Sequence, residues 1–165
     1  MNQTINISAT ATVATIDIEG VIGSEGQNGA VTTYESLREK IAQIEALETP
    51  MVVVNIRSVG GDVADALLIY EALAALDAKV TTICYGYTAS AATIVAQAAS
   101  EGCRLIAPTS LYLVHNSLCA VEGNADEIAA EVELLRQTDE RIAEIYARHS
   151  GRDKQEMAAL MSENC

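Results

Sequence analysis

Hydrophobic positions along the chain follow two periods, and these predict its secondary structure. Residues 11–22 alternate apolar and polar before running into glycines, which predicts a strand, and a loop is expected at 24–29. Apolar side chains at helical spacing over 34–47 predict an amphipathic helix lying on a sheet, with Pro50 closing the connection. A continuous β-branched run at 51–56 predicts a strand covered on both faces.

Two strand-turn-helix motifs follow. The strand, turn and helix are expected at 51–56, 57–62 and 63–76 in one motif, and at 80–84, 85–90 and 91–100 in the next. Strands at 104–107 and 111–115, a glycine-bearing loop at 122–124 and a helix at about 125–148 complete the chain. Repeated units of this kind predict an α/β fold with a mostly parallel sheet and helices on its faces.

The helix expected at 125–148 has one apolar stripe and a mostly acidic opposite face. The stripe consists of Ile128, Val132, Leu135, Ile142 and Ile145, and the acidic face of Glu127, Glu131, Glu133, Asp139, Glu140 and Glu144. This pattern indicates either a surface helix with a solvated acidic face or a helix that projects from the body and packs against a second subunit.

Composition limits the classes of function. The chain has 165 residues, half of them hydrophobic, which fits one globular domain. Its net charge of −13 argues against nucleic acid and against a membrane as partners. There is no signal-peptide pattern and no run approaching about 18 apolar residues, so a cytoplasmic protein is expected.

The four cysteines are scattered without the spacing of a metal site. Cys84 and Cys103 lie in or beside apolar runs and are expected to be small buried thiols, and Cys119 and Cys165 lie apart from them. No metal or cofactor is expected from the residues.

Ser90 lies where an apolar strand gives way to an alanine-rich helix. It is either a helix N-cap or a nucleophile, because both roles suit a serine at a helix start. Gly60 and Gly61 at a strand end allow positive φ and a close backbone approach, either for a tight turn or for an N–H aimed at a carbonyl oxygen. The N–H of Ala91 would then be a second such donor.

His115 ends an apolar stretch and is one of two histidines. The other, His149, falls at the C-terminal end of the long helix, where the helix dipole favours a partial positive charge. His115 is therefore either a structural residue or the base that activates Ser90.

Four stretches together resemble the proteolytic subunit of the Clp protease, over about residues 50–165. They are 55–61, 86–92, 107–116 and 147–151. The second glycine, the serine, the histidine and the later His-x-Gly keep the spacing of that family without a gap. The Ala-Ser-Ala-Ala turn and the His-Asn pair look more like its prophage and phage branch, described as head-maturation proteases.

The resemblance implies repeated β-β-α units of the Clp-protease and crotonase type, a mostly parallel sheet and a long projecting handle helix. It divides the single peptidase domain into a head at about 1–115 and 150–165 and a handle at about 116–149. It also implies a homo-oligomer of stacked rings, a peptide or protein substrate and an AAA+ unfoldase as partner.

Carried over residue by residue, the resemblance makes Ser90 the nucleophile, His115 the general base, and the N–H groups of Gly61 and Ala91 the oxyanion hole. A loop at about 117–123 would be the edge strand that pairs with an extended peptide. The residues implied to bind substrate are Gly60, Ser117, Leu118 and Cys119.

The third catalytic position differs from the family, which has an aspartate where this chain has Asn164. An asparagine can orient a histidine but cannot stabilise imidazolium with a full charge. The third member is therefore open between Asn164, Glu163 and none. Family members usually continue into another strand and helix, so the expectation is a truncated chain or a third member at a frayed end beside Cys165.

Three functions are consistent with the sequence. The first is a self-assembling serine endopeptidase, ATP-independent in itself, that cleaves extended peptides through an acyl-enzyme and processes phage or prophage capsid or scaffold protein. The second is a catalytically silent ring or assembly component. The third is a crotonase-type acyl-CoA enzyme, although the sequence lacks an evident basic cluster for the CoA phosphates.

Overall fold

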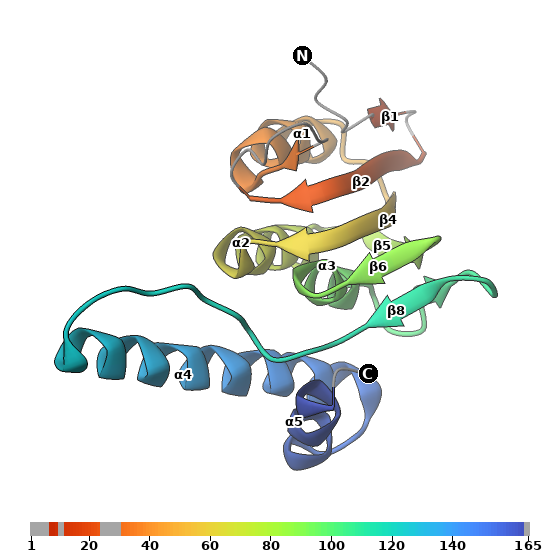
Figure 1. The fold of residues 1–165 in the computed structure, drawn as a ribbon. Coiled ribbons are helices and arrows are strands. Elements are labelled where there is room, and N and C mark those ends of the chain that lie inside the picture. The colour runs from red at the N-terminus through yellow and green to blue at the C-terminus, as the bar shows by residue number, and fades with distance from the viewer. Residues whose placement is uncertain (1–6, 10–11, 24–30, 164–165) are drawn as a thin grey trace. The chain divides into compact units, whose positions relative to one another are not determined.

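The computed structural model of the chain describes residues 7–9, 12–23 and 31–163 (Figure 1). The loop expected at 24–29 lies outside the described residues, as does Asn164. The chain divides into two compact units, Met1–Leu113 and Val114–Cys165. The division of one domain into a head at about 1–115 and 150–165 and a handle at about 116–149 stays a prediction.

The first unit is built on a six-stranded, mostly parallel sheet. Its strands lie in the order β1 (Ile7–Ala9), β2 (Ala14–Ile22), β4 (Met51–Gly61), β5 (Lys79–Cys84) and β7 (Arg104–Ile106), and β3 (Val31–Thr32) pairs with β2. The β1–β2 pair is antiparallel, and the other pairs of this sheet are parallel. A separate parallel pair joins β6 (Tyr87–Ala89) to β8 (Leu111–Leu113). The predicted α/β class with a mostly parallel sheet is confirmed.

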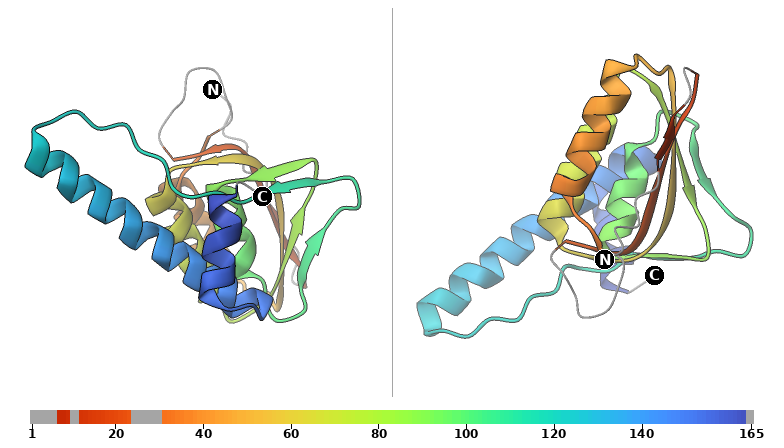
Figure 2. Two further views of the ribbon diagram at one scale, coloured as in Figure 1. Left: turned by 60° about the horizontal axis from the view of Figure 1, so that its bottom comes forward. Right: turned by 90° about the horizontal axis from the view of Figure 1, so that it is seen from above.

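Helices α1 (Tyr34–Ala46), α2 (Val63–Ala74) and α3 (Ala91–Val95) lie on one face of this sheet (Figure 2). Helix α1 starts with a capping box between Thr33 and Ser36, and α2 starts behind Asp62, whose side chain accepts from the N–H of Asp65. Their apolar positions are buried, as the helical spacing predicts: Leu37, Ile41 and Ile44 in α1, and Ala66, Ile69 and Leu73 in α2.

Strand β4 is covered on one face only, so the prediction that 51–56 is covered on both faces is wrong. Val52, Val54 and Ile56 are fully buried, but the alternate positions are half-buried or exposed. The Nδ2 of Asn55 donates to Oδ1 of Asp17 at 2.8 Å on that second face. The β-branched run reflects the preference of such residues for a pleated backbone, which does not require burial on both sides.

Other boundaries also differ from the prediction. The turn expected at 57–62 is mostly strand, since β4 continues to Gly61. The helix expected at 91–100 is shorter and continues as a 3-10 turn, η1 (Ala96–Ala98). Strand β8 ends at Leu113, before His115, and the short strand β6 in the stretch leading to Ser90 was not anticipated.

Cysteine burial agrees with the prediction at one position and not at another. Cys84 is buried, and burial is the first cause that raises the pKa of its thiol. Cys103 is only half-buried, because it leads into the exposed edge strand β7, and Cys119 is exposed. The prediction of a buried thiol is therefore wrong for Cys103.

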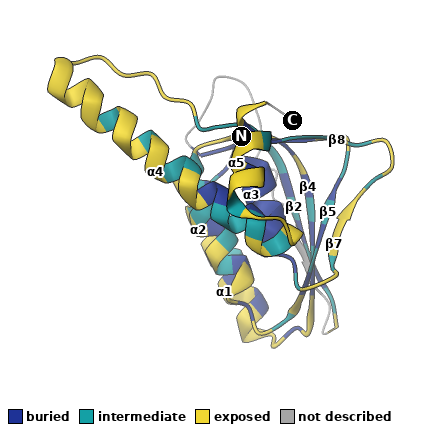
Figure 3. Cartoon of the chain, turned by 90° about the horizontal axis from the view of Figure 1, so that it is seen from below, coloured by how far each residue is buried: buried dark blue, intermediate teal, exposed yellow. Residues whose placement is uncertain are grey.

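The second unit contains two helices, α4 (Ala125–Ser150) and α5 (Lys154–Ser162). The sequence predicts α4, which starts with a capping box from Asn124 and ends at Gly151 with φ +74°, but it gave no prediction of α5. Helix α5 packs on α4, and their buried side chains are Ile142, Ala143 and Tyr146 of α4 and Met157 and Met161 of α5. The first turns of α4 are exposed (Figure 3).

Among the described residues, no helix has both the length and the apolar character needed to cross a membrane.

Candidate active site

Ser90 occupies a strained turn between β6 and α3. Its backbone has φ +55° and ψ −132°, and Glu48 is the other described non-glycine residue with positive φ. Such a conformation costs about 1–3 kcal/mol and persists only where the surroundings hold it. Here the N–H of Ser90 donates to the carbonyl of Leu113 at 2.9 Å, and the N–H of Thr93 donates to the carbonyl of Ser90 at 2.9 Å. A strained strand-to-helix turn with a serine at its apex is the geometry of a nucleophile elbow.

The alternative role of Ser90 as a helix cap is wrong. Ser90 stands at the N-cap position of α3, but its side chain makes no capping hydrogen bond. The side chains of Thr33, Asp62 and Asn124 do make that bond at the starts of α1, α2 and α4. The hydroxyl of Ser90 is thus not engaged in holding its helix.

Gly60 lies directly against this turn. It is buried with φ +89°, and a Cβ added to it would lie 2.6 Å from Cβ of Ser90 and 2.8 Å from the N of Ala91. No residue larger than glycine fits there without moving the backbone of the elbow. The structure therefore brings residue 60 against residues 90 and 91, which follow it by 30 and 31 positions in the sequence.

The two N–H groups expected to form an oxyanion hole flank this contact. Gly61 ends β4, is exposed and has φ +143°, and a Cβ on it would lie 2.0 Å from the carbonyl oxygen of Ile22. Ala91 is the first residue of α3, so its N–H has no partner inside the helix. The role of the Gly61 and Ala91 N–H groups as an oxyanion hole stays a prediction.

Replacing Gly60 by alanine is expected to disrupt the elbow. The clash with backbone and Cβ atoms, added to the positive φ, should lower the free energy of unfolding by about 2–4 kcal/mol. Gly102→Ala is the matched control, because Gly102 has φ +72° with nothing within 4 Å of the added Cβ. It should cost only about 1 kcal/mol. Urea unfolding of the two variants measures the difference, and equal losses would contradict the steric explanation.

His115 belongs to the second unit, within the segment 114–124 that precedes α4. Its Nδ1 lies 2.6 Å from the carbonyl oxygen of Asn116. A carbonyl only accepts, so Nδ1 carries the proton in this contact, and Nε2 of the neutral ring is left as an acceptor. This is the tautomer that a general base requires.

Asn116 was missed by reasoning from sequence. Its main-chain carbonyl accepts from Nδ1 of His115, which is the contact that a third group makes in a catalytic triad. No side-chain pattern reveals a main-chain acceptor, so no sequence signal could have identified it.

The end of α5 meets the segment that carries His115. The N–H of Asn116 donates to the carbonyl of Met161 at 3.2 Å. Glu163 follows two residues later as the exposed C-cap of α5. Asn116, which follows His115 in sequence, is thus hydrogen-bonded to the end of α5. From there the chain continues to Glu163 and Asn164, the two candidates for the third catalytic position.

The segment 117–123 forms no strand. Leu118 is 83% exposed and Cys119 is exposed. Ser117 is held from α4: its N–H and its hydroxyl each donate to Oδ1 of Asp139 at 2.7 Å. The pairing of this segment with a peptide stays a prediction.

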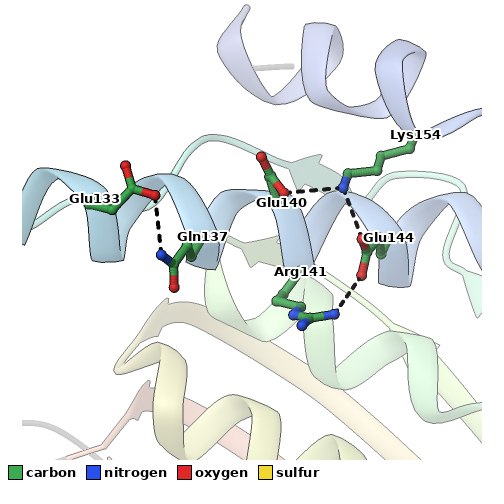
Figure 4. A network of polar contacts seen from close by, with 6 residues as sticks. All are labelled: Glu133, Gln137, Glu140, Arg141, Glu144 and Lys154. Carbon is green, nitrogen blue, oxygen red and sulfur yellow. Dashed lines mark hydrogen bonds and ion pairs between the residues drawn. The ribbon is translucent and has the colours of Figure 1, made fainter.

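Ion pairs join α5 to α4 (Figure 4). The ammonium of Lys154 lies 2.9 Å from Glu144 and 3.4 Å from Glu140, and Arg141 lies 3.1 Å from Glu144. The hydrogen bond from Lys154, followed by its charge, lowers the pKa of Glu144. The hydrogen bond to Glu144 is the first cause that raises the pKa of Lys154.

This link is expected to weaken at both ends of the pH scale. Ionised Glu144 stabilises the folded state above the pKa that it has in the unfolded chain, and this stabilisation is lost as pH falls through its lower pKa in the folded chain. Charged Lys154 stabilises the folded state below the pKa that it has in the unfolded chain, and this stabilisation is lost as pH rises through its higher pKa in the folded chain. Amide-exchange protection of α5 should therefore fall on acidification, by a few-fold because the pair is exposed.

Glu144→Gln should remove most of that pH dependence, and Glu131→Gln, which changes another acidic residue of α4, should leave it intact. Protection that falls equally in the parent and in Glu144→Gln would contradict the assignment.

Comparison with known proteins gives consistent results. The family model described as Clp protease matches residues 16–165. The ATP-dependent Clp protease proteolytic subunit 2 of Treponema denticola is 32% identical over 136 residues, which are 79% of this chain and 68% of the relative. A solved structure of an asparagine-to-aspartate mutant of ClpP1 from Listeria monocytogenes superposes with a TM-score of 0.77 at 22% identity, covering 90% of this chain and 78% of that chain. The last likeness concerns the fold alone.

Proposed function

The chain belongs to the Clp protease family, and from this membership we propose that it is a serine endopeptidase with Ser90 as nucleophile and His115 as general base. The observation that supports this most is the elbow at Ser90. Its backbone is held in a strained conformation, and its hydroxyl is not used as a helix cap. Hydrogen bonds at the turn hold this conformation, and such stored strain is typical of catalytic positions.

The proposed reaction proceeds through an acyl-enzyme. Nε2 of His115 takes the proton of the Ser90 hydroxyl as Oγ bonds to the substrate carbonyl carbon, and the carbonyl oxygen becomes an oxyanion between the N–H groups of Gly61 and Ala91. The imidazolium then gives this proton to the leaving amine as the C–N bond breaks. Water, activated by the same base, releases the acid product and restores Ser90.

The third member of the triad is proposed to be Asn164, with the carbonyl of Asn116 supporting the same histidine. Glu163 is the alternative third member, and the hydrogen bond from Asn116 to Met161 ties the His115 segment to the end of α5, from which the chain continues to both residues. The asparagine also favours a second function, a catalytically impaired ring or assembly component that keeps the fold. A neutral side chain cannot offer the charge that stabilises imidazolium.

Assembly of copies into stacked rings forms part of the proposal. The first half of α4 exposes Ile128 and Val132 of its apolar stripe, each 39% accessible. An apolar stripe on a helix favours burial against another subunit.

Substrate would be an extended peptide or protein, and the Treponema relative is named ATP-dependent, which supports an AAA+ unfoldase as partner. The proposed role in phage or prophage capsid processing rests on the resemblance of the residues around Ser90 and His115 to that branch of the family.

A fluorophosphonate probe tests the proposal, because it forms a covalent bond only with an activated serine. The protein is assembled, its mass is measured by sedimentation, and the modified residue is identified by mass spectrometry. Labelling confined to Ser90 in an oligomeric particle is the expected result. An assembled particle that is not labelled would favour the silent component, and a monomer would contradict the ring.

A further inference from the structure

Residues 114–124 connect β8 to α4 without a helix or strand of their own. Under the proposed function, this segment carries the base His115 near its start and the substrate-pairing edge at 117–123. A peptide that adds to an edge is held by main-chain hydrogen bonds, which require the edge to be fixed in position. The contacts that hold this segment therefore bear directly on substrate binding.

Asp139 supplies the side-chain contact that holds Ser117. One carboxylate oxygen, Oδ1, accepts from both the N–H and the hydroxyl of Ser117, each at 2.7 Å. Bonds to an ionised acceptor are shorter and about twice as strong as neutral ones. Because one of the two donors is main chain and the other side chain, the pair fixes both the backbone position and the rotamer of Ser117.

Asp139 differs in this respect from the carboxylates around it. The sequence places it on the acidic face of α4, which a solvated surface would explain. Glu133 bonds to Gln137 within α4, and Glu140 and Glu144 bond to Lys154 of α5 (Figure 4). Asp139 is half-buried, and its hydrogen-bond partner Ser117 lies in the 114–124 segment. The interpretation of a solvated face is therefore wrong for Asp139.

The contact between Ser117 and Asp139 lies at the border between two parts of the segment. Before it, Asn116 is bonded to Met161, and Asn116 and Asp139 both line a cavity of about 260 Å³. After it, the described structure shows no hydrogen bond from residues 118–123 until Asn124 caps α4. Asp139 thus provides the last anchor before the exposed stretch.

From this placement we infer that Asp139 is a positioning residue, which acts through Ser117 to hold the 117–123 edge for an extended peptide. The inference rests on the proposed function, because the edge has this meaning only in a peptidase. Asp139 takes no part in the bond-making steps. Loss of the anchor should therefore affect the binding of long substrates and leave the reactivity of Ser90 unchanged.

Asp139→Ala is expected to raise KM for an extended peptide by about tenfold or more, while kcat and the fluorophosphonate labelling rate of Ser90 stay within about twofold. Asp139→Asn keeps an acceptor oxygen without the charge and should give a smaller rise. Ser117→Ala removes one of the two donors and should also be intermediate. Added to Asp139→Ala, Ser117→Ala should cause little further change, because both alter the same contact.

Glu133→Ala is the matched control, since it removes a carboxylate from the same helix without touching Ser117, and KM should not change. An unchanged KM in Asp139→Ala, or an equal fall in kcat and labelling, would overturn the inference. If Asp139→Ala fails to assemble, unchanged KM values in both Asp139→Asn and Ser117→Ala overturn it. If Ser90 of the parent protein is not labelled, the proposed function is contradicted, and so is the inference that rests on it.

Discussion

Ser90→Ala and His115→Ala should each lower kcat for peptide cleavage by at least about 10³-fold. Ser90 would supply the atom that forms the acyl-enzyme, and His115 would both remove and return the proton. Residues that act as a unit are strongly non-additive, so the double variant should be no slower than either single one. Initial rates on a fluorogenic peptide, together with fluorophosphonate labelling, measure both effects.

Ser36→Ala and His149→Ala are the controls for these two changes. Ser36 belongs to the capping box of α1, so its loss should cost stability, about 1 kcal/mol, without lowering kcat. His149 lies in the last turn of α4 and has no role in the proposed reaction. Additive losses in the Ser90 and His115 double variant would show that the two residues do not share one step.

Asn164→Asp should raise kcat by about 10²–10³-fold. The reverse change in a serine protease triad costs about 10⁴-fold, because the carboxylate stabilises the imidazolium and holds its tautomer. The carbonyl of Asn116 already accepts from Nδ1 of His115, so part of the orienting role is filled and the gain should fall short of the maximum. Steady-state kinetics on the assembled protein measure the change.

Glu163→Gln separates the two candidates for the third position. If Asn164 is the third member, this neutral variant should leave kcat within about twofold of the parent, in contrast to the gain at position 164. A fall in kcat with Glu163→Gln and no gain with Asn164→Asp would instead assign the role to Glu163. A large gain from a parent without measurable turnover would favour the impaired ring component as the natural state.

Local pattern predicted most of the fold. The spacing of Leu37, Ile41 and Ile44 identifies α1, and the same logic identifies α4, since each helix must bury one face. Boundaries that depend on partners were less well predicted. Strand β4 runs through Arg57 to Gly61 because β2 pairs with it along that length, as far as Ile22 with Gly61.

Among the candidate site residues, the sequence by itself determined the residue types and their spacing: a serine before a helix, a glycine pair after a strand and a histidine after a later strand. These follow from local backbone preferences and from resemblance to a family. Only the tertiary structure decided that Ser90 is held at positive φ without capping α3, that Gly60 packs on it, and that Asn116 and Asp139 hold the segment beyond His115. Those features depend on strain and hydrogen bonds between residues distant in sequence or on main-chain atoms, which no side-chain pattern encodes.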